Sequence, residues 1–132
     1  MNPKFAEKFI SMNRDKILKL FSFYQIIEIM LFWKLYSQEL TKLDEEKQKS
    51  IILGKTLGKL KSKYEKTNSC DDLLLKELNE LIPQRNNFMH SMWTILAISK
   101  TEDEAFMHGN YMLDKYQAKA SVVFELLGRL NT

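Results

Sequence analysis

The sequence predicts an all-α protein, a single-domain bundle of four or five helices over residues 1–132. Apolar residues recur at steps of three and four along most of the chain, which is the spacing of one helical face. No segment alternates apolar and polar residues with the period of two that marks a strand. The chain holds 4 glycines and 2 prolines, few for the many tight turns of an all-β fold. Its 132 residues, 45% of them apolar, suit one domain with its own core.

The first predicted helix is a long apolar run over residues 17–40. Two apolar stripes lie side by side on it, so this helix should be covered on more than one side. One side faces the core, and the other requires a second helix or another subunit. The first stripe comprises Ile17, Leu20, Phe21, Tyr24, Ile27, Leu31 and Leu35, and the second comprises Phe23, Ile26, Met30 and Trp33.

This run is also long enough to raise the question of a membrane span, which needs about 20 residues. Lys19, Gln25, Glu28 and Lys34 interrupt it, and a central charge costs roughly 2.5–3.5 kcal/mol on insertion scales. We therefore expect no membrane span. Residues 1–16 show neither a long apolar run nor a small-residue cleavage site, so we expect no signal peptide and a cytoplasmic protein.

The second predicted helix covers residues 45–66. Gly54 and Gly58, four apart, should let a neighbouring helix approach closely. A stripe of lysines on the other side is either a solvated face, the simpler interpretation, or a contact for an RNA backbone if it flanks a functional site. The apolar side comprises Ile51, Ile52, Leu53, Leu57, Leu60 and Tyr64, and the lysine stripe comprises Lys55, Lys59, Lys63 and Lys66.

Three further helical stretches follow. Asn68 or Ser69 should cap the next helix, whose first turn holds acids that suit the helix dipole. Pro83 should kink or restart this helix, with a new stretch over residues 84–98. Thr101 and Glu104 form a capping-box pattern at the start of the last helix, which runs towards residue 130. Residues 108–110, His-Gly-Asn, are expected to break or bend it.

Charge and cysteine content exclude some classes of site. Twenty Lys and Arg against seventeen Asp and Glu leave a net charge of +3, which permits nucleic-acid contact without arguing for it. Cys70 is the one cysteine, so no internal disulfide can form. With His90 and His108 it is too little for a zinc site without several carboxylates. We expect neither a metal nor a cofactor.

The residues that suggest chemistry are Arg85, Asn86 and His90. Asn86 and His90 are four apart and share a helical face. Arg85 is five from His90, about 140° around an ideal α-helix, so the two converge only if the first turn is loosened or the arginine wraps round. A histidine can exchange a proton with a ribose 2′-hydroxyl or a leaving oxygen near neutral pH. An arginine can hold a phosphate, and an asparagine can orient either group. The trio suits metal-independent phosphoryl transfer on RNA.

The stretch Arg85-Asn86-Asn87-Phe88-Met89-His90 resembles the signature of the HEPN superfamily (higher eukaryotes and prokaryotes nucleotide-binding domains). That signature is an arginine, four to six residues and a histidine, often with a polar residue directly after the arginine. Here it has the form R-N-x-x-x-H. The wider chain is similar as architecture, with an α-bundle, a long apolar helix early and the motif late in the chain. The resemblance thus covers six residues as motif and most of the length as architecture.

The resemblance implies a metal-independent endoribonuclease that leaves a 2′,3′-cyclic phosphate at a composite site of a homodimer. A dimer partner would cover the second apolar stripe, and the arginine of one subunit could act with the histidine of the other. Many bacterial members are toxins or phage-defence proteins, often paired with a nucleotidyltransferase antitoxin. In one branch the antitoxin modifies a tyrosine two residues beyond the histidine. Here that position is Met92, followed by Trp93, which does not fit that mode of control.

Simpler interpretations stand beside these. Arg85 and Asn86 could be ordinary polar residues of a helix start, and His90 a core histidine bonded to a backbone carbonyl. Glu28, a lone acid in a run that looks buried, could pair with Arg85 or orient His90, or lie on a wetter face. Some HEPN proteins have lost catalysis. The alternative function is therefore a non-catalytic scaffold or sensor module that dimerises or binds a partner protein.

Overall fold

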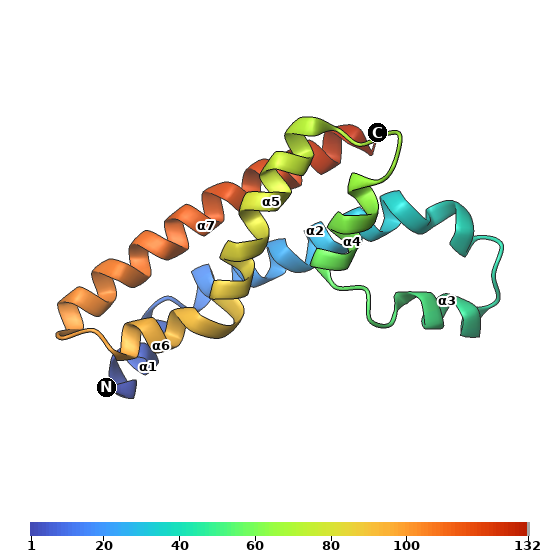
Figure 1. Cartoon of the computed structure of the whole chain (residues 1–132). Coiled ribbons are helices and arrows are strands. Elements are labelled where there is room, and N and C mark those ends of the chain that lie inside the picture. Colours follow the sequence, from blue (N-terminus) through green and yellow to red (C-terminus); the bar gives the residue numbers. More distant parts are fainter. Residues whose placement is uncertain (132) are drawn as a thin grey trace.

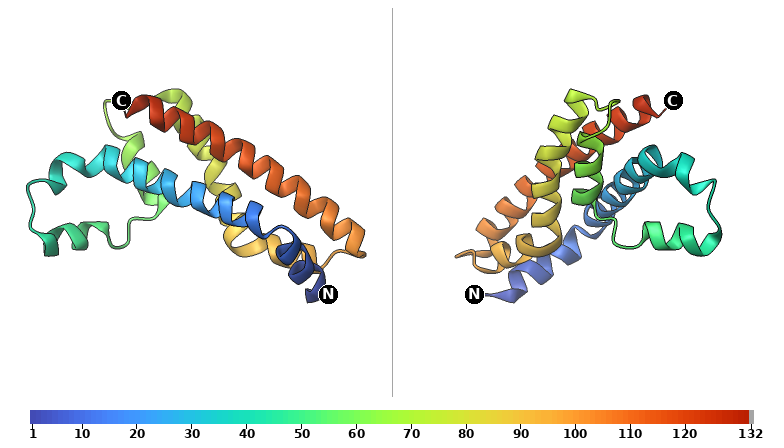
Figure 2. Two further views of the ribbon diagram at one scale, coloured as in Figure 1. Left: turned by 180° about the vertical axis from the view of Figure 1, so that it is seen from behind. Right: turned by 45° about the vertical axis from the view of Figure 1, so that its right-hand side comes forward.

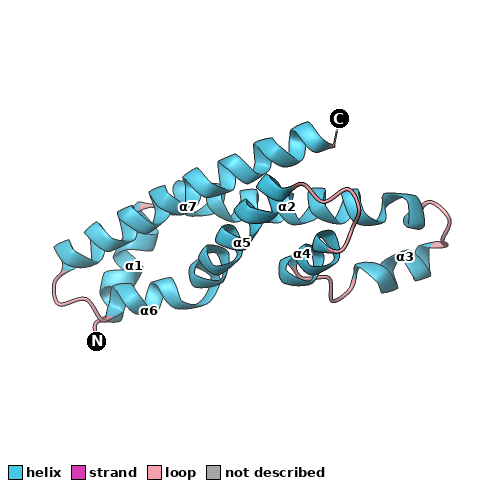
Figure 3. Ribbon diagram, turned by 45° about the horizontal axis from the view of Figure 1, so that its top comes forward, coloured by secondary structure: helices cyan, strands magenta, loops and turns pink. Residues whose placement is uncertain are grey.

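The computed structural model describes residues 1–131, and all regular structure in that range is helical (Figure 3). The all-α prediction is confirmed for this part of the chain, although it holds more helical segments than four or five. The elements are α1 (Pro3–Met12), α2 (Arg14–Leu40), α3 (Glu45–Ile52), α4 (Leu57–Glu65), α5 (Asp72–Asn86), the π-helical turn η1 (Asn87–Ser91), α6 (Met92–Ala97) and α7 (Glu102–Leu130).

The bundle is built around its two long helices, α2 and α7, which pack along each other (Figures 1 and 2). The continuous helical segment of α5, η1 and α6 changes direction at η1 and packs on α7 (Figure 1). Helix α4 packs between α2 and α5. At the end near the N-terminus, α1 packs against α6 and α7. At the other end α3 projects away from the bundle (Figure 1). None of the helices within residues 1–131 is both long and apolar enough to cross a membrane.

The core lies between α2, α5 and α7. Four residues of the first predicted stripe are fully buried on α2, as expected: Leu20, Tyr24, Ile27 and Leu31. Full burial of one such side chain contributes about 1.5–3 kcal/mol. The same stripe was expected to include Phe21, which is instead 42% exposed. The facing core residues include Leu74, Leu78, Leu81, Leu113, Tyr116, Ala120, Val123 and Leu127.

The second predicted stripe of α2 is only partly covered. Phe23 and Met30 pack against the core, with the Phe23 ring edge-on to Phe124 at 5.5 Å between centroids. Ile26 and Trp33 stay exposed. Within the described chain, α2 therefore keeps an apolar side towards solvent.

The predicted helix over residues 45–66 is wrong, because α3 and α4 are separate. The chain turns between them at Gly54, whose φ of 78° is easily reached only without a Cβ. Thr56 then caps α4 by accepting a hydrogen bond from the Lys59 amide at 3.3 Å. The expected close helix approach is wrong too, since a Cβ added at Gly54 or Gly58 would meet nothing within 4 Å.

The glycine that does allow close approach is Gly109. A Cβ there would lie 2.5 Å from ring atoms of Phe9, so α1 can pack onto α7 only if this residue lacks a side chain. The predicted break at residues 108–110 is wrong, because α7 runs through them. His108 lies within this helix and not in a loop, with its Nε2 3.5 Å from a carboxylate oxygen of Glu104.

Helix caps agree in part with the sequence. Thr101 caps α7 by accepting from the Glu104 amide at 3.1 Å, as predicted. The cap of α5 is Asp71, which accepts from the Leu74 amide at 2.9 Å, and not Asn68 or Ser69. Asp72 lies in the first turn as expected. The backbone of α5 thus begins three residues later than an asparagine cap at position 68 would place it.

Candidate active site

The motif lies where the segment of α5, η1 and α6 changes from α-helical to π-helical. Pro83 does not restart the helix, contrary to the prediction, since α5 continues through it to Asn86. The irregularity comes afterwards, in the π-helical turn over Asn87–Ser91. There the Met92 amide donates to the Asn87 carbonyl, five residues back. Such single π turns inside α-helices are rare and occur often at functional sites.

The π turn changes the angle between the two ends of the motif. In a π turn the backbone hydrogen bonds join residues five apart. Residues five apart therefore lie nearly above one another, as residues four apart do in an α-helix. The angle of about 140° between Arg85 and His90 falls to about half of that when most of the intervening residues are π-helical. The turn therefore supplies the loosening that the sequence requires if Arg85, Asn86 and His90 are to share a face.

The three predicted site residues are accessible to solvent. Asn86 and His90 are exposed and Arg85 is half-buried. One Arg85 Nη1 lies 3.4 Å from the Asn86 side-chain oxygen, a long hydrogen bond between neighbours. Within residues 1–131 none of the three pairs with a carboxylate, and His90 is not a core histidine. The arginine and the histidine are thus open to an anionic ligand.

A polar cluster that the sequence did not reveal lies beneath the turn. Asn87 points inward and donates from Nδ2 to the Tyr116 hydroxyl on α7, with Met112 Sδ 3.6 Å away. Burial raises the pKa of Tyr24 well above its usual range, Tyr116 raises it further, and the Arg85 guanidinium partly offsets both. Arg85 therefore lies within electrostatic reach of the Tyr24 hydroxyl. An α-helical phase assigned from sequence gives no reason to direct Asn87 inward.

Apolar residues of the turn hold it against the core. Phe88 is buried and packs on Tyr24 and Trp93, with ring centroids 5.6 and 5.7 Å apart. Met92 is fully buried, and Met89 packs against the core. These side chains are therefore taken up by packing within the protein. The side of the turn opposite the exposed polar residues thus packs against the hydrophobic core.

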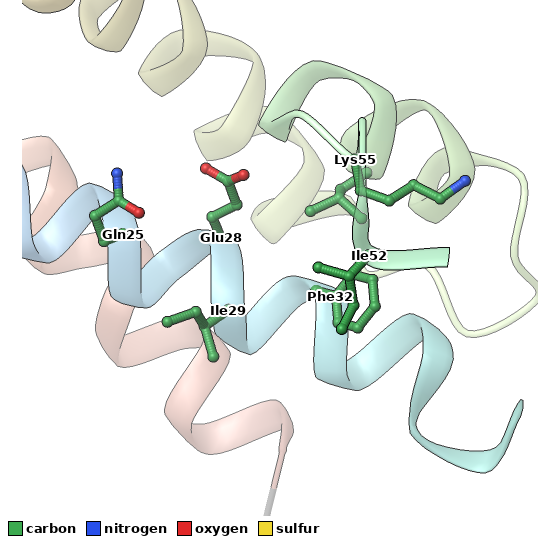
Figure 4. Close-up of a pocket in the computed structure, with 7 residues that line it drawn as sticks. Gln25, Glu28, Ile29, Phe32, Ile52 and Lys55 are labelled. Carbon is green, nitrogen blue, oxygen red and sulfur yellow. The ribbon is translucent and has the colours of Figure 1, made fainter. Parts of the chain in front are cut away.

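Glu28 does not pair with Arg85 or His90, the two partners considered for it in the sequence. Glu28 is half-buried. Within the described part of the chain its carboxylate makes no side-chain hydrogen bond and no ion pair, so it pairs with neither Arg85 nor His90. It lines a pocket between α2, the end of α3 and α4, with its carboxylate rising from α2 (Figure 4). The seven lining residues are Gln25, Glu28, Ile29, Phe32, Ile52, Lys55 and Leu60.

The predicted lysine stripe is not one continuous face. Lys55 lies in the turn before α4, and Lys63 sits over the Tyr36 ring at 3.6 Å while its Nζ is 3.5 Å from Glu39. Lys59 and Lys66 are exposed. The stripe is thus divided between aromatic contacts and solvent, and its contact with RNA stays a prediction.

No protein-family model, no curated protein and no solved structure matches this chain. The resemblance to the HEPN superfamily therefore rests on the motif and on the helical architecture. Within residues 1–131 no group of three or more His, Cys, Asp or Glu side chains is placed to hold a metal ion.

Proposed function

We propose that the protein is a metal-independent endoribonuclease of the HEPN type, with a composite site of Arg85, Asn86 and His90 at a homodimer interface. The observation that supports the proposal is the π turn between Arg85 and His90, because such a turn reduces the angle between residues five apart on the helix. The same turn directs Asn87 to Tyr116 inside the protein, so it has a structural role as well. A site that needs Arg85 and His90 on one face gains from the smaller angle between them.

The proposed reaction uses each residue in one role. His90 accepts the proton of a ribose 2′-hydroxyl, whose oxygen attacks the adjacent phosphorus. The bond from phosphorus to the 5′-oxygen breaks, and that oxygen takes up a proton, which leaves a 2′,3′-cyclic phosphate and a 5′-hydroxyl. Arg85 stabilises the charge that builds up on the phosphate oxygens. Asn86 orients Arg85, to which it is already hydrogen-bonded.

The biological setting belongs to the same proposal and rests on the resemblance. We propose a cytoplasmic toxin or phage-defence component, controlled by an antitoxin or a nucleotidyltransferase partner. Met92 stands where one branch of the superfamily has a modified tyrosine, and it is fully buried. Control by modification at that position is therefore not part of the proposal.

RNA cleavage in EDTA tests the proposal. The wild type should cut structured and unstructured RNAs to products that end in a 2′,3′-cyclic phosphate. His90→Ala and Arg85→Ala should each lower the rate at least about a hundredfold, the usual range for a lost acid–base group or charge stabiliser. His108→Ala is the matched control, because His108 is the other histidine and is exposed on α7, and it should cleave like the wild type.

Two results would overturn the proposal. One is cleavage that survives both substitutions, which would place the activity elsewhere or in a contaminant. The other is a folded wild-type dimer that leaves varied RNAs intact, which would favour the non-catalytic scaffold or sensor module. Far-ultraviolet circular dichroism on the same samples separates lost chemistry from lost fold.

A further inference from the structure

The solvent-facing side of α2 is apolar, which is unusual for a helix at the edge of a bundle. Five large side chains on it recur at steps of three to five residues and are each 41–64% exposed. The end of α3 adds two more, Ile52 at 51% and Leu53 at 76%. Ile52 and Ile29 line the same pocket, so the two parts are continuous (Figure 4). We call this surface the α2 face: Leu18, Phe21, Ile26, Ile29, Trp33, Ile52 and Leu53.

The size of the α2 face is that of an interface. Large apolar side chains have areas on the order of 150–250 Å² each, so the exposed parts together amount to roughly 700 Å². The largest apolar patch on a typical monomer is about 300–600 Å². A standard protein interface buries about 800 Å² on each partner. The α2 face therefore matches one side of such an interface.

Two charges of opposite sign lie on the pocket in this surface. Glu28 comes from α2 and Lys55 from the turn before α4. Neither forms an ion pair within the described residues. The Lys55 amine lies 5.5 Å from the centre of the Tyr36 ring and is directed away from the Glu28 carboxylate (Figure 4). In a twofold interface residue i of one copy meets residue j of the other, and j meets i. One acid and one base on the same face therefore complement a second copy of this chain.

We propose that the α2 face is a twofold self-association surface in which Glu28 of each copy pairs with Lys55 of the other. The inference takes the dimeric state from the proposed function and assigns it a surface and a recognition pair.

Charge exchange between copies tests the proposal directly. Sedimentation equilibrium of the wild type should show a dimer. Glu28→Lys leaves two lysines at each contact and Lys55→Glu leaves two acids, so each variant should dimerise at least about tenfold more weakly. An equimolar mixture of the two variants restores opposite charges at both contacts, and it should form a one-to-one heterodimer with an affinity near that of the wild type. Ile29→Asp tests the apolar part, and should give a folded monomer because Ile29 is exposed.

Glu7→Lys and Lys100→Glu are the matched controls, because both residues are exposed at the end of the bundle near the N-terminus. They should dimerise like the wild type. A monomeric wild type overturns the inference, and so does a dimer that survives Glu28→Lys, Lys55→Glu and Ile29→Asp, or a mixture that fails to associate. RNA cleavage is read on the same samples. A dimer through the α2 face without cleavage overturns only the proposed function, whereas cleavage by a protein that dimerises elsewhere overturns only the surface.

Discussion

Asn87, in the π-helical turn, donates a side-chain hydrogen bond to the hydroxyl of Tyr116, which lies on α7 twenty-nine residues later in the chain. Asn87 is half-buried and Tyr116 is buried. The bond joins η1 to α7, the longest helix of the bundle. Asn87 follows Asn86 directly and precedes His90 by three residues. The residue that makes this bond and the candidate site residues therefore belong to the same part of the helix. The register of the site thus depends on a contact made in the interior.

We predict that Tyr116→Phe destabilises the protein by about 1–3 kcal/mol, because the Asn87 amide loses its partner in a buried place. Thermal unfolding should show a midpoint several degrees lower. If the protein cleaves RNA, the same change should lower the rate through the register of Arg85 and His90. Tyr111→Phe is the control, since Tyr111 is exposed on the same helix, and it should stay within about 0.5 kcal/mol of the wild type. Equal stability of both variants would contradict the anchor.

Tyr24 and Tyr64, two further buried tyrosines, should respond in opposite ways. The Tyr24 hydroxyl is buried without a hydrogen-bond partner among residues 1–131, so Tyr24→Phe removes a desolvated polar group and should be neutral or stabilising. The Tyr64 hydroxyl accepts from the Asp71 amide at 2.7 Å, so Tyr64→Phe should cost about 1 kcal/mol or more. Urea unfolding of the two variants measures both effects. A loss of stability in Tyr24→Phe as large as that in Tyr64→Phe would disprove this assignment.

We expect Gly109→Ala to destabilise the protein by about 1–3 kcal/mol, since the new Cβ would lie 2.5 Å from the Phe9 ring and force α1 away from α7. Gly128→Ala is the matched control on the same helix, because a Cβ there meets no atom of the described residues within 4 Å. That change should stabilise by up to about 1 kcal/mol through helix propensity. Calorimetric unfolding of the two variants should therefore shift in opposite directions.

The ion pairs between α5 and α7 predict a pH dependence. Lys119 contacts Glu77 and Glu80, and its hydrogen bond holds the pKa of Glu80 below the ordinary value. A lowered carboxyl pKa contributes stability above the unfolded-state pKa, and this contribution is lost as the pH falls through the folded-state pKa. Lys119→Gln should therefore flatten the loss of stability in the acid range below about pH 5.

The Lys119 side carries the opposite sign. Glu77 first, and then Glu80, raise the pKa of Lys119, so its contribution is present below the ordinary lysine pKa and is lost at more alkaline pH. Chemical denaturation from pH 3 to pH 11 measures both limbs. Lys115→Gln, an exposed lysine of α7 without a carboxylate contact within residues 1–131, should keep the wild-type profile. A profile that Lys119→Gln leaves unchanged would contradict the coupling.

Local patterns predicted what depends on residues close in sequence. The steps of three and four gave the all-α class, and they placed Leu20, Tyr24, Ile27 and Leu31 on the buried side of α2. The Thr101 cap was also predicted, because its hydrogen bond spans only three residues. In the same way, the motif of Arg85, Asn86 and His90 could be recognised as a string of residues.

The errors fall where distant contacts decide. Residues 45–66 have a helical period throughout, yet the chain turns at Gly54 because α4 packs between α2 and α5 while α3 does not. Gly109 looked like a helix breaker, but it is the space into which Phe9 fits. Phe21 follows the buried period and is still exposed, since no helix within residues 1–131 covers it.

By itself the sequence determined the helical class, the buried stripe of the long helix and the residues of the motif, because these follow from periodicity and from identity. The tertiary structure decided which side of α2 stays exposed and where the π-helical turn forms. This turn depends on Asn87 reaching Tyr116 on α7, a bond whose partners are adjacent only after α5 and α7 have packed. No local pattern in the sequence predicts that bond, because its partners are twenty-nine residues apart.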